Sequence, residues 1–191
     1  IAKNISDSNF KGERMSNDYL IVVDAQNDFV TGSLGSEQAQ TAMVHAVERV
    51  KAHEGPVVFT MDTHHEDYLD TQEGQILPVV HCVEDEDGWR LIPQMEALQE
   101  ELSAPVFKKP TFASVQLAEF LKQRNDEELI DSIQLIGLCT DICVVSNALT
   151  IKGFLPDVPI SVSEQCCAGV TPESHDAALQ TMRSCQIQIV D

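Results

Sequence analysis

Short apolar runs and helix-like segments alternate along most of the chain. The apolar runs have the length of strands and lie at 19–26, 56–62, 105–109, 133–140, 159–165 and 186–190. Other segments carry apolar residues at helical spacing, and we expect helices at 37–53, 93–102, 113–125, 141–154 and 172–182. In the first of these, apolar side chains return every three or four positions, as on one face of an amphipathic helix. The order of elements is that of repeated βαβ units.

The expected strands are apolar over nearly their whole length and do not alternate between apolar and polar residues. Strands that are buried on both faces lose this alternation, which is typical of parallel sheets covered by helices. The sequence therefore predicts an α/β fold with a mostly parallel, doubly wound sheet. In open sheets of this kind, functional groups gather beyond the carboxyl ends of the strands.

Two segments depart from this alternation. Residues 1–14 are polar, mixed in charge and without a period, so we interpret them as a loose N-terminal arm or an expression remnant. We expect residues 15–191 to form a single domain, because they contain no internal repeat, linker or low-complexity tract. The stretch at 63–93 is polar and aperiodic, and compact domains seldom keep such long irregular segments unless a site is built there.

The excess of acidic over basic residues limits the kinds of molecule that the protein is expected to bind. Twelve Lys and Arg residues stand against 31 Asp and Glu residues, which gives a formal net charge of −19. A field of this sign repels nucleic-acid phosphates and acidic lipids, so we expect neither nucleic acid nor a membrane as partner. The chain has no bilayer-length apolar run and no secretory signal pattern, and we expect a soluble, cytoplasmic protein. Its six cysteines are unevenly placed and are expected to stay reduced.

Several residues that can carry chemistry follow expected strands. Asp24 stands where the first apolar run stops, Lys108 and Lys109 close the third, and Cys143 follows the fourth. Each has an ordinary explanation: Asp24 can form a turn or helix cap, the lysines can be solvated, and Cys143 can be a small buried hydrophobe. Successive side chains of a strand face opposite ways, so only one of the two lysines can point into a crevice.

Together, these residues supply what a thiol nucleophile needs. A cysteine at the first turn of a helix lies near the positive end of the helix dipole, which favours the thiolate. Asp24 can accept the thiol proton, and Lys109 can hold the sulfur in its anionic form. None of the six histidines is placed to act as the base, so the pattern differs from that of a Cys–His hydrolase. The sequence therefore predicts nucleophilic chemistry at Cys143.

A second group of candidate residues lies in and beside the polar stretch. Asp62, His64, Glu73 and His81 offer carboxylate and imidazole ligands, and Asp70 is a weaker alternative to Glu73. This mixture suits Zn²⁺, Mn²⁺ or Fe²⁺ better than Ca²⁺ or Mg²⁺, which prefer oxygen ligands alone. The spacing of Asp62 and His64 places both on one side of an extended segment. The alternative is that these are ordinary exposed residues of an acidic chain.

Five motifs occur in an order that is specific to a known family. They are VVDAQNDF, the DTH of 62–64 with the later LPVVHC, VFKKPTF, GLCTDICV and CCAGVTPESHDAAL. On these motifs the chain resembles the isochorismatase-like cysteine hydrolases, and within them the nicotinamidases, from Tyr19 to Val190. The resemblance implies a three-layer α/β/α fold and the hydrolysis of a small amide by a cysteine nucleophile.

The resemblance also implies roles for particular residues. Asp24, Lys109 and Cys143 match the catalytic triad of the family, with Lys109 rather than Lys108 as the family lysine. It implies a cis peptide before Cys139, whose backbone N–H joins that of Cys143 in an oxyanion hole. The metal ligands that match the family are Asp62, His64 and His81, with Glu73 as the expected fourth; Zn²⁺ is the metal we expect first.

The substrate is less closely defined by the motifs. Phe29 matches a ring-contacting aromatic residue, and Phe112, Leu77 and Ile142 are expected as further substrate contacts. Some relatives carry Trp or Phe where this chain has Leu77 and Pro78. Nicotinamide is the expected substrate, and the alternatives are another small amide or an N-carbamoyl compound. A catalytically inactive binding protein on the same fold and a metal-only hydrolase are further alternatives, and family habit implies a homo-oligomer.

Overall fold

The computed structural model describes residues 16–191 and contains one six-stranded sheet. The strand order is β3-β2-β1-β4-β5-β6, and every neighbouring pair is parallel. The strands are β1 (Asp18–Val23), β2 (Val57–Asp62), β3 (Val106–Lys109), β4 (Ser132–Leu138), β5 (Ile160–Ala168) and β6 (Gln188–Val190). The predicted parallel, doubly wound sheet is confirmed, whereas the predicted arm at 1–14 lies outside the described residues.

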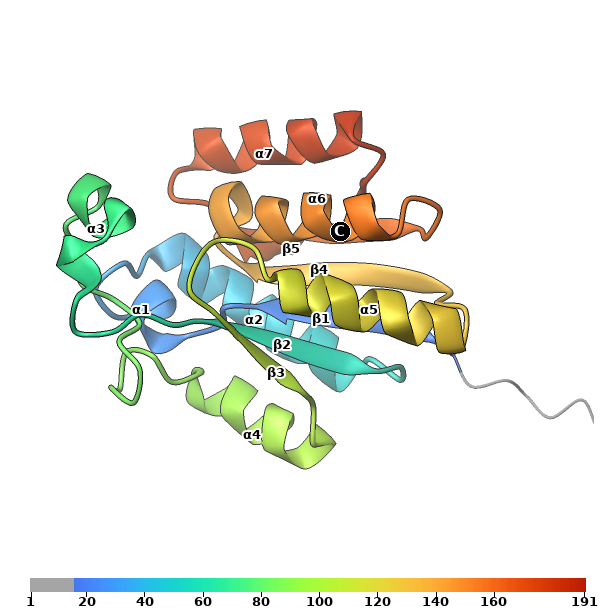
Figure 1. Cartoon of the computed structure of the whole chain (residues 1–191), viewed down its shortest axis with the longest axis horizontal. Coiled ribbons are helices and arrows are strands. Elements are labelled where there is room, and N and C mark those ends of the chain that lie inside the picture. Colours follow the sequence, from blue (N-terminus) through green and yellow to red (C-terminus); the bar gives the residue numbers. More distant parts are fainter. Residues whose placement is uncertain (1–15) are drawn as a thin grey trace, which may run out of the picture.

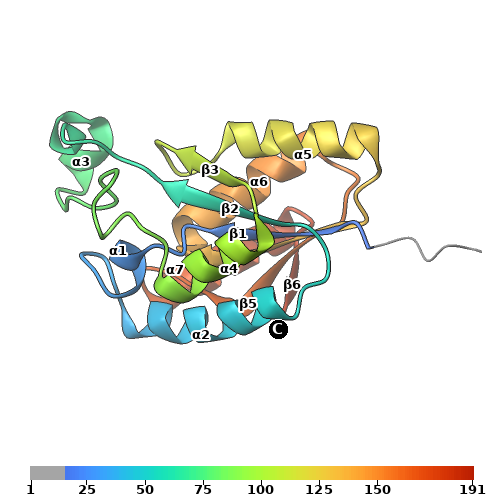
Figure 2. The same cartoon turned by 90° about the horizontal axis from the view of Figure 1, so that it is seen from below.

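Helices cover both faces of the sheet (Figures 1 and 2). On one face lie α2 (Glu37–Lys51) and α4 (Pro93–Leu102), and on the other lie α5 (Val115–Glu127), α6 (Val145–Phe154) and α7 (Pro172–Ser184). Two short helices, α1 (Asn27–Val30) and α3 (Gln72–Ile76), lie at the end of the sheet where the strands finish. Among residues 16–191, no helix has the length and apolar character to cross a bilayer.

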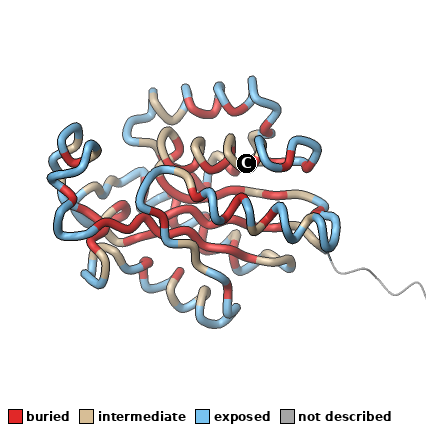
Figure 3. The backbone as a smooth tube through the Cα atoms, viewed as in Figure 1, coloured by how far each residue is buried: buried red, intermediate tan, exposed pale blue. Residues whose placement is uncertain are grey.

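The two cores explain why the strands are apolar throughout. In β1, Leu20 and Val22 pack toward α2 and α4, whereas Ile21 and Val23 pack toward the helices of the opposite face. All four side chains are fully buried. Figure 3 shows buried residues along the central strands and exposed residues on the outer sides of the helices. The absence of polar–apolar alternation therefore reports burial on both faces.

The order of the strands reverses direction at β1, which lies between β2 and β4. In doubly wound sheets, the crevice beyond the carboxyl ends at such a point is where ligands bind. Asp24 directly follows β1, Lys109 ends β3, and Cys143 follows β4. The topology therefore brings these three residues, far apart in the sequence, to the same edge of the sheet.

The structure differs from the sequence-based expectations in three segments. The stretch at 63–93 contains a short 3₁₀ turn at Tyr68–Asp70 and α3, which are too short to give a periodic signal. The helix expected at 141–154 begins as a π turn at Thr140–Val144 and becomes α-helical only at Val145. β5 extends to Ala168, so the vicinal Cys166 and Cys167 lie within the strand and not after it.

Candidate active site

Asp24, Lys109 and Cys143 meet beyond the carboxyl ends of β1, β3 and β4. Lys109 Nζ lies 2.6 Å from Asp24 Oδ2 and 3.4 Å from Cys143 Sγ. All three residues are buried, with Lys109 only 1% exposed. The neighbouring Lys108 points the other way and pairs with Glu84 at the surface, 2.7 Å away. The strand period thus selects Lys109 as the lysine that faces the crevice.

The turn after β1 fixes the Asp24 carboxylate. Asp24 adopts a left-handed backbone conformation with φ of 47°, where the chain leaves the strand. Its Oδ1 accepts a hydrogen bond of 2.7 Å from Thr60 Oγ1 on β2, while its Oδ2 faces Lys109. Gln26, not Asp24, is the N-cap residue of α1. The helix-cap explanation of Asp24 therefore does not hold.

A sharp turn after β4 presents Cys143. Gly137 has a φ of 120° and lies so close to β1 that a Cβ would collide with the Val23 carbonyl. The Leu138–Cys139 peptide is cis, as the family resemblance implied. The Cys139 carbonyl then accepts hydrogen bonds from the N–H groups of Ile142 and Val144, at 3.1 and 3.0 Å. These contacts place the nucleophile candidate, Cys143, within the π turn, one residue before its end.

Burial and charge set the protonation states of this group. The pKa of Cys143 is raised well above its ordinary value, first by burial and then by the charge of Asp24, with Lys109 opposing. Burial also raises the pKa of Asp24, although Lys109 acts in the opposite direction. Burial alone would lower the pKa of Lys109, but the charges of Asp24 and Cys143 outweigh it and raise the pKa. These directions favour a neutral thiol at Cys143 and an ammonium at Lys109.

The helix dipole alone favours a thiolate at Cys143, but the pKa of this thiol is raised, so the predicted thiolate is wrong for the resting protein. The first cause is desolvation, which disfavours a buried anion. The adjacent Asp24 carboxylate adds to the effect. Lys109 counters it in part, so the thiol remains within reach of both a base and a cation.

Four side chains next to the triad form a candidate metal site. The ligand atoms of Asp62, His64, Glu73 and His81 all lie within 4.8 Å of one another. His64 Nε2 is 3.0 Å and His81 Nε2 is 3.5 Å from Asp62 Oδ2. Asp70, the weaker alternative to Glu73, is exposed on the 3₁₀ turn and is not part of this cluster.

The surroundings of the cluster hold its ligands in position. The Val79 carbonyl lies 2.8 Å from His81 Nδ1, so this nitrogen donates a hydrogen bond and Nε2 is left free to bind a metal. The ring of Tyr68 packs against both His64 and His81, at 4.7 and 5.0 Å between centroids. Hydrogen bonds from the two histidines lower the pKa of Asp62 despite its burial. Two imidazoles and two carboxylates are a fitting donor set for zinc or another first-row divalent metal.

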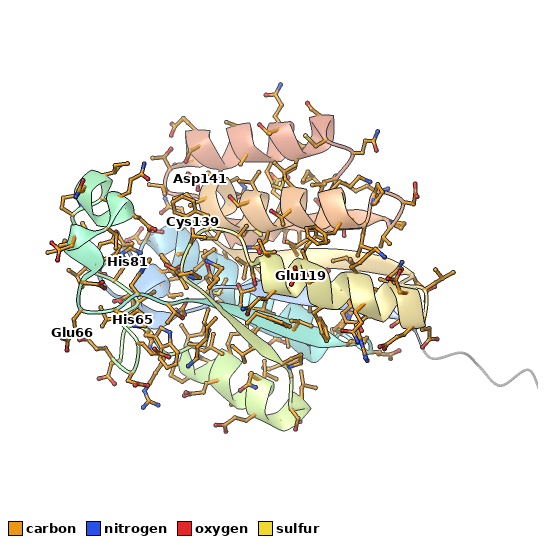
Figure 4. The ribbon with its side chains drawn as sticks, in the orientation of Figure 1. His65, Glu66, His81, Glu119, Cys139 and Asp141 are labelled. Atoms are coloured by element: carbon orange, nitrogen blue, oxygen red, sulfur yellow. The ribbon has the colours of Figure 1, made fainter. Side chains whose placement is uncertain are left out.

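The metal cluster and the triad are joined by one contact. Lys109 Nζ lies 3.4 Å from Asp62 Oδ1, so the same ammonium touches both groups. In the view of Figure 4, His81 and Cys139 lie at the same end of the sheet, beside α3 and the segment that leads into α6. The two candidate sites are therefore parts of one polar centre.

A cavity of about 490 Å³ opens over this centre. Its lining includes the four expected substrate contacts, Phe29, Leu77, Phe112 and Ile142. It also includes Asp62, Glu73, His81, Cys139 and Cys143. The cavity brings together residues from the expected triad, the expected metal site and the expected substrate contacts.

Two buried amide side chains also support the site and were not identified from the sequence. Asn147 donates to the carbonyls of Cys143 and Phe112, at 2.8 and 3.0 Å. Gln26 donates to the Asp62 carbonyl and accepts from the Asp62 N–H, both at 2.8 Å. Asn147 could have been noticed as a polar residue on the apolar face of an expected helix. Gln26 could have been noticed as an amide at the end of the first apolar run.

The comparisons with known proteins agree with the fold. The isochorismatase domain profile matches residues 18–191. A nicotinamidase/pyrazinamidase of Mycobacterium tuberculosis is 26% identical over an alignment that covers 90% of this chain and 97% of the relative. The crystal structure of a nicotinamidase from Bacillus subtilis is 25% identical, with a TM-score of 0.76 over 92% of this chain and 99% of that one.

A third comparison shows the same fold in a metal-bound protein. The pyrazinamidase of Pyrococcus horikoshii in complex with zinc has a TM-score of 0.75 and 23% identity, over 92% of this chain and 99% of that chain. The resemblance expected from the five motifs is confirmed by the match of the domain profile to nearly all described residues. The chain belongs to the isochorismatase family.

Proposed function

We propose that the protein is a cysteine amidohydrolase that converts nicotinamide and water into nicotinate and ammonia. The observation that carries the proposal is the contact of Lys109 with both Asp24 and Cys143, together with the position of Cys143 in the lining of a cavity. A base, a cation and a thiol in contact are what acyl transfer to a cysteine requires. The nicotinamidases among its relatives support amide hydrolysis and this substrate.

The first half of the reaction forms a thioester. Asp24 accepts the proton of the Cys143 thiol, and the sulfur attacks the amide carbon. The oxygen of that carbon becomes negative and is held by the backbone N–H groups of Cys139 and Cys143, which are the expected oxyanion hole. Lys109 stabilises the sulfur anion as it forms, because its ammonium lies 3.4 Å from Sγ. The C–N bond then breaks, and Asp24 gives its proton to the amide nitrogen, which departs as ammonia.

The second half releases the acid. Asp24, again ionised, accepts a proton from a water molecule that attacks the thioester carbon. The C–S bond breaks, nicotinate leaves, and the proton returns to Cys143. The raised pKa of Asp24 suits both halves, since this carboxyl must take up and release a proton in each.

The metal site has a supporting role in the proposal. Asp62, His64, Glu73 and His81 would hold the ion, and we propose Zn²⁺ first, as in the zinc complex of the Pyrococcus horikoshii pyrazinamidase. When bound, a divalent metal supplies a Lewis acid that can orient and polarise the pyridine ring through its nitrogen. Phe29, whose ring is 5.6 Å from that of His81, is placed to contact the substrate beside this site.

A coupled ammonia assay over a panel of small amides tests the proposal. We expect the metal-loaded protein to release ammonia from nicotinamide, and Cys143→Ala to lose at least about 10³-fold in kcat while keeping its fold and metal content. Cys185→Ala, which changes an exposed cysteine, is the matched control and keeps wild-type turnover. Normal turnover by Cys143→Ala refutes the nucleophile assignment. If ammonia is released from N-carbamoyl compounds but not from nicotinamide, the substrate belongs to the alternative class.

A further inference from the structure

The outer part of the cavity is apolar and more open than its floor. Three apolar side chains line it and are exposed: Ile76 on α3 at 78%, Val170 after β5 at 62% and Phe112 after β3 at 42%. We call these three residues the apolar rim. They come from three separate segments of the chain, and all of them line the cavity that contains Cys143.

We infer that the site accepts carboxamides whose acyl group carries a neutral, apolar substituent extending past a single aromatic ring toward the apolar rim. The inference rests on the proposed amidohydrolase function and adds a substrate class to it. Three features of the cavity support this inference: its volume, the division of its lining into a polar floor and an apolar rim, and the charge around its mouth.

The cavity is larger than nicotinamide needs. Its volume of about 490 Å³ equals that of roughly sixteen water molecules at about 30 Å³ each. Nicotinamide has about nine non-hydrogen atoms and occupies well under the whole of a pocket in this size class. An amide placed over Cys143 with its ring beside Phe29 therefore leaves part of the cavity unfilled.

The chemistry of the lining divides the cavity into two parts. The groups that can react or bind a metal, among them Cys143, Asp62 and His81, are buried at the floor. The apolar rim stands above them and gains most from contact with a substituent that is itself apolar, because such contact removes apolar surface from water. The rim thus offers a binding surface that the reacting amide group cannot use.

Charge excludes acidic substituents. The described residues that line the cavity include no Lys or Arg, and its two carboxylates, Asp62 and Glu73, belong to the candidate metal site. The whole chain carries a net charge of −19, so the field at the mouth disfavours anions. A neutral substituent avoids this repulsion, whereas a carboxylate at the same position does not.

A series of substituted substrates tests the inference on the metal-loaded protein. The probes are nicotinamide and pyridine-3-carboxamides with a methyl, propyl or pentyl group at ring position 5 or 6, together with a carboxylate-ended analogue of the longest. We expect kcat/KM to rise about 3- to 4-fold for each methylene that is buried at the rim, in at least one of the two ring positions. The carboxylate-ended analogue is expected to lose this gain.

Variants of the apolar rim locate the effect. Ile76→Ser and Val170→Ser should each lower the ratio of kcat/KM for the pentyl compound to that for nicotinamide by at least about 3-fold. Val44→Ser is the matched control, because Val44 is 65% exposed on α2 and does not line the cavity. We expect this control to leave the ratio unchanged. Thermal melting checks that each variant is folded.

The outcomes separate the two proposals. If nicotinamide is hydrolysed but no extended amide is preferred, the inference is overturned and the proposed function stands. If neither nicotinamide nor any extended amide is hydrolysed, the proposed function fails and the inference falls with it. A third outcome comes from the molar mass of Ile76→Ser in solution. If this variant loses an oligomer that the wild type forms, and the ratio of kcat/KM for the pentyl compound to that for nicotinamide is unchanged, the apolar rim is a subunit contact and the inference is overturned.

Discussion

Asp24 and Cys143 share an environment that moves both of their pKa values in the same direction. Each is buried, and burial is the first cause of the raised pKa in both. The charge of Asp24 also raises the pKa of the thiol, because a carboxylate disfavours a second anion beside it. Lys109 is the cation that limits both shifts. The proton therefore passes from a thiol with a raised pKa to a carboxylate with a raised pKa.

This coupling predicts opposite effects of Asp24→Asn on two reactions of the same sulfur. Removing the carboxylate takes away a cause of the raised thiol pKa, so Cys143 should ionise at a lower pH and react faster with iodoacetamide near pH 7. Amide hydrolysis should fall by about 10²- to 10⁴-fold, since the base is lost. Mass spectrometry of alkylated Cys143 over a pH series, together with the ammonia assay, measures both.

The exposed Asp157 provides the matched control for this prediction. Asp157→Asn makes the same chemical change at the surface and should alter neither the alkylation profile nor the hydrolysis rate. A wild-type alkylation profile in Asp24→Asn would mean that the carboxylate does not act on the sulfur. Unchanged hydrolysis in that variant would remove Asp24 from the reaction.

The sequence alone predicted which residues form the candidate site, but it did not predict their protonation states. The positions of Asp24, Lys109 and Cys143 followed from strand ends and from the family motifs, since both are visible in the order of residues. The pKa directions depended on desolvation, which is a property of the folded surroundings. For the same reason Asn147 was not found, because its role depends on which carbonyls the fold brings to its amide.

The π turn that carries Cys143 is held from outside by the segment that begins α7. Thr140 Oγ1 lies 2.8 Å from His175 Nδ1, and Asp141 Oδ1 accepts the N–H of Val170 at 3.0 Å. Thr140 is fully buried, whereas His175 is half-buried, so this hydrogen bond is partly buried. The last expected motif of the family, which contains His175, thereby contacts the element that presents the nucleophile.

His175 is therefore expected to act as a positioning residue. Loss of its contact in His175→Ala should loosen the turn and lower kcat by about 10-fold or more with a smaller change in KM, because misplaced oxyanion donors weaken the transition state selectively. His175→Asn, which retains a hydrogen-bonding group near the Nδ1 position, should recover part of the loss. Steady-state kinetics on nicotinamide measure the split between kcat and KM.

The exposed His45 on α2 is the control for the His175 prediction. His45→Ala removes the same side chain from a helix surface and should leave kcat and KM unchanged. Equal kcat loss in His175→Ala and His175→Asn would contradict a role for the hydrogen bond. A large rise in KM at constant kcat would instead indicate a binding role.

The pattern of elements was predictable because hydrophobic period and strand length are local signals. The departures depend on backbone hydrogen bonds and close packing, which leave no hydrophobic period in the sequence. The π turn is shaped by the Cys139 carbonyl, which accepts from two N–H groups, and α3 is held in place by packing around Tyr68. The strand order β3-β2-β1-β4-β5-β6 also lay beyond the sequence argument, because the same alternation of elements is compatible with several orders.

Across the described chain, burial affects many weak acids, both in the strands and in the turns and loops around them. Burial is the first cause that raises the pKa of four cysteine thiols and two tyrosines: Cys82, Cys139, Cys143, Cys167, Tyr19 and Tyr68. The pKa values of Cys139 and Tyr68 rise to about 12. These groups are neutral in the folded protein at a pH where the same groups in the unfolded chain have lost their protons.

The free energy of unfolding should therefore fall as the solution becomes alkaline. A raised pKa contributes stability below the unfolded value, which is 9.0 for a thiol, and this stability is lost as pH rises toward the folded value. Above about pH 9, each such thiol should lower the unfolding free energy by about 1.4 kcal/mol per pH unit. Urea titrations at several pH values measure this slope. Cys167→Ala should make this slope shallower by about 1.4 kcal/mol per pH unit. Cys185→Ala, at an exposed cysteine, should leave the slope unchanged. Identical slopes in Cys167→Ala and the wild type would contradict the raised pKa of Cys167.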